Sequence, residues 1–283
     1  MKRKTRRLLI QTLHFAVCAL IAVLMAYPLL WMLGASFKEN AEIYNNANIF
    51  PRAKWVTTAF ADGWRGVGEL NFGVFMKNSI LIVLMVVPLT LISSTLTAYG
   101  FARFRFVGKQ VYFMLMLSTL MLPNAVIQVP TYILFRDLGW LNSYLPMVVP
   151  SAFAANSFLV FMLVQFFRNL PRDLDEAARI DGCNSMMILI LILVPLCVPA
   201  MITTGLFQFM WTWNDYFRPL LYLNSGKLYT VALGLRMSLD TTSGVQWNQI
   251  MAMSTLSVLP CIVLFFCLQK YFVEGIATSG MKA

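Results

Sequence analysis

Charge is scarce in this sequence. Charged residues make up 12% of the 283 residues, whereas hydrophobic residues make up 59%. A soluble domain usually carries about 25% charged residues, so most of this chain is expected to lie in lipid rather than in water. The excess of 22 basic over 12 acidic residues could indicate nucleic-acid binding, but the positions of the basic residues favour a membrane topology, and we expect no nucleic acid as a partner.

Motifs for catalysis and metal binding are also missing. His14 is the only histidine, and one histidine cannot form a metal site. The sequence contains no H-E-x-x-H, no G-x-S-x-G and no G-x-x-x-x-G-K-[ST] pattern. We therefore expect a non-catalytic chain without a metal or cofactor of its own. The five cysteines lie in or beside apolar runs, which predicts no disulfide framework: Cys18, Cys183, Cys197, Cys261 and Cys267.

Six long runs contain no charged residue, namely 8–37, 78–102, 110–135, 138–167, 182–214 and 241–269. A membrane-spanning helix needs roughly 20 residues, and each run is long enough. The sequence therefore predicts an all-α integral membrane protein that forms a single domain over residues 1–283. Its six spans are expected at about 8–36, 78–100, 110–134, 142–167, 186–212 and 245–269.

The basic residues predict the orientation of these spans. Residues 2–7 read K-R-K-T-R-R directly before the first run, and short connections rich in Lys and Arg stay in the cytoplasm. With the N-terminus inside, the cytoplasmic segments hold 13 of the 22 basic residues. We expect both termini and the loop 168–185 to be cytoplasmic. The start of the chain also resembles a signal peptide, but its apolar run is too long and no good A-x-A site follows, which favours an uncleaved span.

The spans contain several prolines but no Asp, Glu, Lys or Arg near their centres. Prolines kink helices, so one interpretation is a set of kinked helices around a cavity that opens and closes. The other is packing, because membrane helices commonly contain proline. Secondary transporters usually couple through intramembrane ionisable groups, which disfavours that class but leaves neutral Na⁺ sites open. These prolines include Pro88, Pro123, Pro130, Pro146, Pro150, Pro195, Pro199 and Pro260.

The loop 168–185 contains the most polar stretch between the spans, P-R-D-L-D-E-A-A-R-I-D-G-C-N at 171–184. Asp173 followed three residues later by Glu176 predicts a capping box, and Gly182 predicts the helix end, which together give a helix of about 173–181. Asp175 and Arg179 are expected to form an exposed pair across one turn.

One side of this short helix is expected to carry small residues at its centre, because residues three and four apart share a face. These residues are Leu174, Ala177, Ala178 and Asp181. A helix this short is marginal alone, so it must pack on something. The two alternatives are a docking helix for a partner and a surface helix that braces its own loop.

The residues E-A-A-R-I-D-G at 176–182, followed by L-V-P-L-C-V-P-A at 193–200, resemble the signature loop of ABC-importer permeases, the membrane subunits of binding-protein-dependent uptake systems. The stretches 165–182, 211–223 and 268–283 are similar to the carbohydrate-uptake branch, specifically the G-type subunit of maltose permeases. The resemblance covers nearly all of residues 8–283, although the terminal Gly-Met-Lys-Ala is not identical to the family's ending. It implies the type I ABC-importer permease fold in a bacterial inner membrane.

The resemblance also implies a mechanism and a set of partners. The loop helix would dock on one of a pair of cytoplasmic ATPases, which bind ATP and Mg²⁺, and their closure would switch the spans between outward- and inward-facing states. A second permease subunit, expected to be a different chain, and an extracytoplasmic sugar-binding protein would complete the system. The residues that the resemblance assigns to ATPase coupling are Asp173, Glu176, Ala177, Ala178, Arg179, Asp181 and Gly182.

Polar residues within the spans are candidates for a sugar path, because amide groups suit hydrogen bonding to sugars. They are Asn124, Gln128, Asn156, Ser157 and Gln208. The alternative is hydrogen bonding between helices, which neutral polar residues in membranes commonly provide. Trp211, Trp213 and Tyr216 suggest a sugar platform, but an aromatic belt at the membrane surface is favoured. The alternative function for the whole chain is a secondary transporter or channel for a small polar solute.

Overall fold

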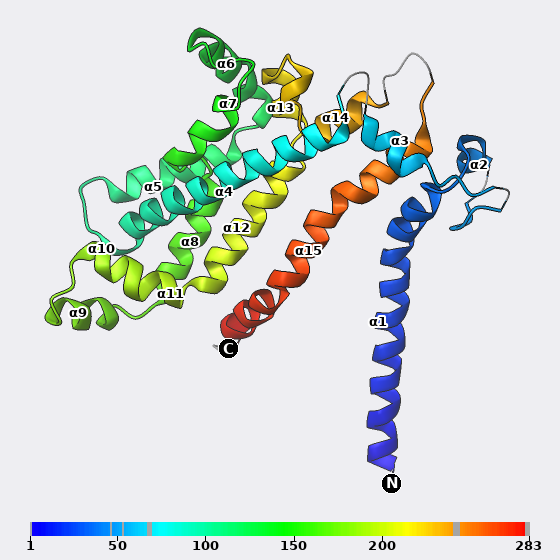
Figure 1. Ribbon diagram of the computed structural model, residues 1–283. Helices are drawn as coiled ribbons and strands as arrows, with labels where there is room; N and C mark the ends of the chain where they lie inside the picture. The colour runs from blue at the N-terminus through cyan, green and yellow to red at the C-terminus, as the bar shows by residue number, and fades with distance from the viewer. Residues whose placement is uncertain (1, 46, 53, 67–69, 240–243, 281–283) are drawn as a thin grey trace. The chain divides into compact units, whose positions relative to one another are not determined.

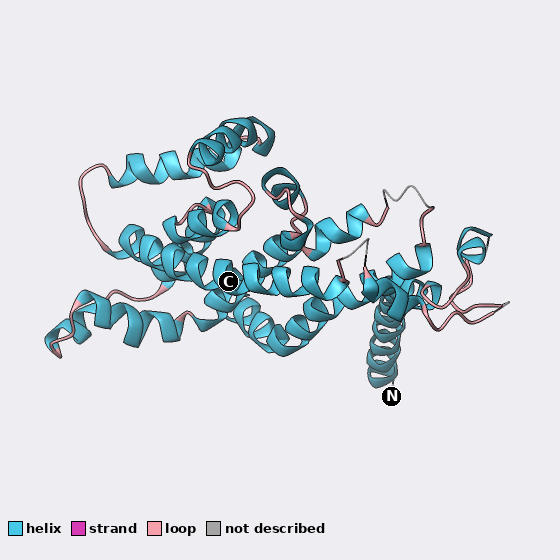
Figure 2. Ribbon diagram, turned by 45° about the horizontal axis from the view of Figure 1, so that its top comes forward, coloured by secondary structure: helices cyan, strands magenta, loops and turns pink. Residues whose placement is uncertain are grey.

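The computed structural model describes residues 2–45, 47–52, 54–66, 70–239 and 244–280. All regular elements in those ranges are helices (Figures 1 and 2). The chain divides into two compact units, one formed by Met1–Gly73 with Gly234–Pro260 and the other by Val74–Leu233 with Cys261–Ala283. The all-helical class predicted from the uncharged runs is confirmed. That the whole chain acts as one membrane domain stays a prediction.

The elements follow one another along the chain without strands between them in the described residues. In chain order they are α1 (Lys2–Ala35), α2 (Asn40–Asn45), α3 (Ala59–Arg65), α4 (Phe72–Arg103), α5 (Lys109–Ser118), η1 (Thr119–Met121), α6 (Asn124–Asp137), α7 (Leu145–Val148), η2 (Val149–Phe153), α8 (Ser157–Asn169), α9 (Asp173–Ile180), α10 (Ser185–Ile188), the π-helical η3 (Leu189–Leu193), α11 (Val194–Leu196), α12 (Val198–Trp213), α13 (Phe217–Tyr222), η4 (Gly226–Leu228), α14 (Val231–Met237) and α15 (Trp247–Gly280).

Within the described parts of the chain, four helical segments are long and apolar enough to cross a membrane, namely Arg7–Ala35, Phe72–Arg103, Leu145–Asn169 and Trp247–Lys270. Two further pairs pass the same criteria together but are bent: Lys109–Met121 with Ala125–Asp137, at 104°, and Ser185–Leu196 with Val198–Trp213, at 82°. If each bent pair is one span, the described residues contain six spans in the predicted order. The side of the membrane on which the termini lie stays a prediction.

Prolines mark both bends. Pro123 lies between η1 and α6, and Pro195 and Pro199 lie on either side of Cys197, where α11 gives way to α12. Because Pro195 has no N–H, the carbonyl of Leu191 loses its α-helical partner. The chain forms the π-helical turn η3 just before this proline, as helices do where the regular ladder is interrupted. The predicted kinks are therefore found in spans three and five.

In the first unit, α2 is tied to the start of α15. The side-chain amide of Asn40 donates to Gln246 Oε1 and accepts from the backbone N–H of Asn248, the latter at 3.1 Å. Tyr44 meets Trp247 edge-on, with ring centroids 5.9 Å apart. These contacts hold the connection after α1 against the beginning of the last long helix.

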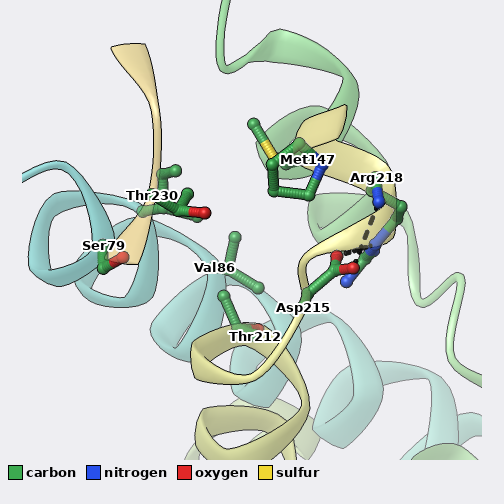
Figure 3. A pocket seen from close by; sticks show the side chains of 9 residues that line it. Ser79, Val86, Met147, Thr212, Asp215, Arg218 and Thr230 are labelled. Atoms are coloured by element: carbon green, nitrogen blue, oxygen red, sulfur yellow. Dashed lines mark hydrogen bonds and ion pairs between the residues drawn. The ribbon is translucent and has the colours of Figure 1, made fainter. Parts of the chain in front are cut away.

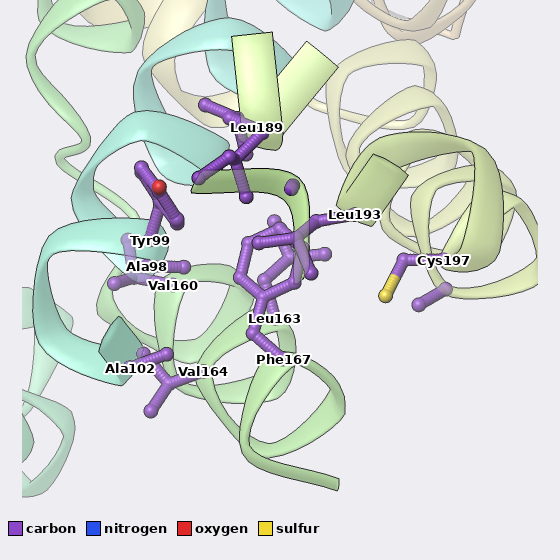
Figure 4. Packing of buried hydrophobic residues seen from close by; sticks show 13 residues of the cluster. Ala98, Tyr99, Ala102, Val160, Leu163, Val164, Phe167, Leu189, Leu193 and Cys197 are labelled. Carbon is purple, nitrogen blue, oxygen red and sulfur yellow. The ribbon is translucent and has the colours of Figure 1, made fainter. Parts of the chain in front are cut away.

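In the second unit, the core lies around one face of α8 (Figure 4). Five residues of that face are buried and recur at helical spacing: Leu159, Val160, Leu163, Val164 and Phe167. All of them except Leu159 belong to one cluster with Ala98, Tyr99 and Ala102 from the end of α4, with Ala178 of α9, and with residues of α10, η3 and α12. This cluster is the base on which α9 rests.

Candidate functional site

Helix α9 ends at a sharp, well-bonded turn. Cys183 N donates to the carbonyl of Ala178 at 2.9 Å, and Gly182 N donates to that of Arg179 at 3.1 Å, which is the Schellman pattern. Gly182 has φ of +86°, a left-handed conformation that glycine adopts without steric cost. The predicted helix end at Gly182 is confirmed.

The start of α9 lies where it was predicted, but its capping differs from the prediction. The helix begins at Asp173 itself, and Arg172 before it makes no side-chain cap. The predicted capping box is therefore wrong, because Asp173 lies within the first turn rather than ahead of it. Asp173, Asp175 and Glu176 all fall in that turn, where the positive end of the helix dipole stabilises carboxylates.

The outer side of α9 is a continuous exposed stripe. Asp173, Glu176, Ala177 and Ile180 lie at i, i+3, i+4 and i+7 and are all exposed. Ile180 is 87% exposed, an unusual position for a large apolar residue beside charged neighbours. Two carboxylates, a small residue and an apolar tip therefore share one face that is free to meet another molecule.

The inner side of α9 faces its own chain. Asp175 and Ala178 are buried, and Leu174 is half-buried. The predicted small-residue side of Leu174, Ala177, Ala178 and Asp181 is thus wrong: Ala177 and Asp181 are exposed, whereas Ala178 belongs to the buried cluster. The reason is that the helix rests on its chain along positions 174, 175 and 178, which turns Ala177 outward.

Asp175 pairs with Arg103 rather than with Arg179. Nε of Arg103 lies 3.1 Å from Oδ2 of Asp175, and the two side chains are only 5% and 13% exposed. The predicted exposed pair of Asp175 and Arg179 is therefore wrong, because Asp175 is turned inward while Arg179 is exposed. Both guanidinium N–H₂ groups of Arg103 also donate to the carbonyl of Leu170, at 3.1 and 3.2 Å.

Three of the predicted path residues have bonding partners within the chain. Asn156 Oδ1 caps α8 by accepting from Leu159 N at 3.4 Å. The hydroxyls of Ser157 and Thr119 lie 2.8 Å apart. Gln208 is buried and donates to Thr212 Oγ1 at 2.9 Å. These bonds favour structural roles. Only the contact between Ser157 and Thr119 joins two helical elements, as the alternative of hydrogen bonding between helices expects; the bonds of Asn156 and Gln208 are local to one helix.

The other two path candidates are less informative. Gln128 is half-buried in α6, and the side chain of Asn124 lies outside the described residues.

Asn156 functions as a cap because the predicted span 142–167 is interrupted. Ala154 has φ of +52°, a rare left-handed conformation for a residue with a side chain, and α8 starts only at Ser157.

One small cavity in the second unit lies near the end of α12 (Figure 3). Its volume is about 10 Å³, which is room for a single water. Asp215 and Arg218, which form an ion pair, face it together with Thr212, Ser79 and Thr230. A cavity of this size cannot hold a sugar, and the predicted path residues do not line it. Among the described residues, no three His, Cys, Asp or Glu side chains are grouped to hold a metal.

Residues 91–278 match the family described as the binding-protein-dependent transport system inner membrane component. The chain belongs to this family. The matched region includes α9 and both bent spans. As a member of the family, the chain is a multi-pass protein of the bacterial inner membrane and a permease component of an importer.

Relatives along the whole chain agree with this family. The arabinooligosaccharides transport system permease protein AraQ of Halalkalibacterium halodurans is 32% identical, with 100% of both chains covered. The trehalose/maltose transport system permease protein MalG of Thermococcus litoralis is 29% identical over 93% of this chain and 94% of its own. A chain in the crystal structure of a bacterial ABC transporter involved in the import of alginate has a TM-score of 0.79 at 23% identity, covering 93% of this chain and 96% of that chain. This likeness shows a shared fold.

The structure places three residues at or beneath the surface of α9 that the sequence analysis did not identify as part of the candidate site. Ile180 was detectable as the one large apolar residue on the polar side of the helix. Arg103 and Tyr99 were not, because an arginine just after an apolar run looks like an ordinary cytoplasmic anchor, and a tyrosine near a span end looks like a residue of the aromatic belt.

Proposed function

We propose that this chain is the membrane-spanning subunit of an ATP-driven importer that takes up a carbohydrate, in particular an oligosaccharide, delivered by an extracytoplasmic binding protein. Membership of the permease family supports the importer role. The names of the full-length relatives, which refer to arabinooligosaccharides and to trehalose and maltose, support a carbohydrate as the cargo. A second permease subunit, expected to be a different chain, completes the pathway.

The exposed stripe of α9 docks on a cytoplasmic ATPase in this proposal. The observation that carries it is the division of α9 into a buried side and an exposed side. Glu176 and Asp173 are suited to basic groups on the partner, Ala177 allows close approach, and Ile180 is suited to an apolar pocket. The partner ATPase binds ATP and Mg²⁺, and this chain supplies only the surface that the ATPase contacts and displaces.

The remaining coupling residues fall into two groups. Arg179, Asp181 and Gly182 are exposed and extend the docking surface on either side of Ile180. Ala178, which was also expected to contact the ATPase, supports the surface from below, because it is 4% exposed and packed on its own chain.

The test is ATP-driven uptake by the complete complex. The tagged chain is purified with its partners, reconstituted in liposomes with a binding protein, and assayed for uptake of labelled oligosaccharides and for ATP hydrolysis. Glu176→Lys reverses the charge of the exposed stripe, so it is expected to lower uptake at least tenfold while leaving the amount of folded chain unchanged. Asp137→Lys, at an exposed carboxylate at the end of α6, is the control and is expected to transport normally.

The rival function is a secondary transporter or channel for a small polar solute. Uptake by the chain alone, without ATP, would establish that rival and overturn the proposal. Normal coupled uptake by Glu176→Lys would overturn the docking of α9 while leaving the importer role in place.

A further inference from the structure

The end of α4 holds the loop of α9 at three points. Arg103 donates to the carbonyl of Leu170, ahead of α9, and forms the ion pair with Asp175, within α9. Tyr99 donates its hydroxyl hydrogen to the carbonyl of Ser185, beyond α9, at 2.9 Å. Tyr99 and Arg103 are four residues apart and therefore lie on one face of α4. A single helical turn of α4 thus contacts the loop before, within and after the short helix.

These contacts are shielded from water. The ion pair is buried, and Tyr99 is only 7% exposed. The ring of Tyr99 contacts those of Phe104 and Phe167, at centroid distances of 5.1 and 6.5 Å. Ala98 and Ala102, one residue before each of the two polar anchors, belong to the same buried cluster as Ala178. The inner side of α9 is therefore fixed by both charge and packing.

The ion pair between Arg103 and Asp175 opposes a displacement of α9 relative to α4. Oδ1 of Asp175 is buried without a hydrogen bond among the described residues, so the carboxylate depends on Arg103 for its stabilisation. Removing one partner of a buried ion pair is strongly unfavourable, because the other charge is left uncompensated. Sliding α9 along α4 would separate the two charges in the same way. Sliding of α9 along α4 is therefore energetically unfavourable.

We propose that Arg103 is a positioning residue that fastens α9 to α4 through Asp175 and Leu170, so that movement of the docked ATPase reaches the membrane spans through α4. This inference rests on the proposed docking of α9 on an ATPase. Asp175 therefore lies in the contact between α9 and α4, although Asp175 belongs to the same acidic stretch as the exposed Asp173 and Glu176. Tyr99 holds the far end of the loop in the same way.

The test compares coupling in the complete complex, reconstituted as for the uptake assay. Asp175→Asn removes the charge and keeps the shape, and Arg103→Lys keeps the charge but replaces the planar fork that reaches two acceptors at once. Each is expected to lower the uptake per ATP hydrolysed by about tenfold, while the amount of ATPase retained on purification stays within about twofold of wild type. Arg105→Lys, at an exposed arginine two residues away, is the control and should leave the ratio unchanged.

A second measurement separates anchoring from general destabilisation. Backbone amide exchange in residues 170–185 is expected to accelerate about tenfold or more in Asp175→Asn, while exchange in the buried face of α8 stays as in wild type. Equal acceleration in both places, or a normal uptake-to-ATP ratio in both variants, would overturn the anchoring role. A wild-type complex that shows no ATP-driven uptake would instead refute the proposed function, so the two failures are distinguishable.

Discussion

Ala177 and Ala178 are adjacent and chemically identical, yet the structure gives them opposite surroundings. Ala177 is exposed, and Ala178 is 4% exposed within the buried cluster. Replacing each with leucine therefore separates docking from folding. Added methylenes in a packed core typically cost about 1–3 kcal/mol, whereas exposed substitutions usually change stability by within about 0.5 kcal/mol.

We expect Ala178→Leu to lower the thermal unfolding temperature of the purified chain and Ala177→Leu to leave it unchanged. For ATPase binding we expect the opposite order, with the larger loss of affinity in Ala177→Leu. If the ATPase closes tightly over Ala177, a leucine there overpacks the interface by a similar 1–3 kcal/mol, and since about 1.4 kcal/mol is a factor of ten, affinity falls roughly 5- to 150-fold. Unfolding is followed by intrinsic tryptophan fluorescence, and ATPase binding by titration onto the chain in nanodiscs. Wild-type ATPase affinity in Ala177→Leu, combined with wild-type stability in Ala178→Leu, would refute the assignment of the two faces.

Two further predictions concern other parts of the chain. A Cβ at Gly34 would lie 1.8 Å from the carbonyl oxygen of Ile49, so Gly34→Ala should lower the unfolding temperature. A Cβ at Gly100 would meet nothing within 4 Å. Gly100→Ala should therefore keep or raise the unfolding temperature, because alanine stabilises a helix by up to about 1 kcal/mol relative to glycine. Ser157→Ala removes the hydroxyl contact with Thr119 at 2.8 Å, a kind of bond worth about 0.6 kcal/mol in membranes. It should leave the apparent KM for the sugar unchanged, and a KM raised several-fold would instead place Ser157 in the path.

The sequence was sufficient for features that depend on local chemistry. Uncharged runs of spanning length predict helices because lipid leaves the backbone no other partner, and the bends at Pro123 and between Pro195 and Pro199 follow from the missing N–H groups. Gly182 was predictable as a stop, because few other residues adopt its backbone conformation. These features need no knowledge of which helices are neighbours.

Features that depend on distant neighbours were not predictable. Asp175 looks like a solvated first-turn carboxylate, and only the position of Arg103 in space shows that it is buried. The orientation of α9 was also not predictable, because its amphipathic pattern is too short to distinguish Ala177 from Ala178. Asn156 looked like a polar residue within a span, but the break at Ala154 makes it a helix cap.

The fastening of α9 to α4 also sets the order in which this protein can be completed. Arg103 and Leu170 are separated by 67 residues, and α5, α6, α7 and α8 lie between them in the chain. During synthesis from the N-terminus, the arginine therefore enters the membrane surface long before its acceptors exist. The loop is fixed only after the intervening helices have packed into the cluster around α8. The exposed stripe of α9 therefore reaches its final position late in synthesis, after α8 has been added.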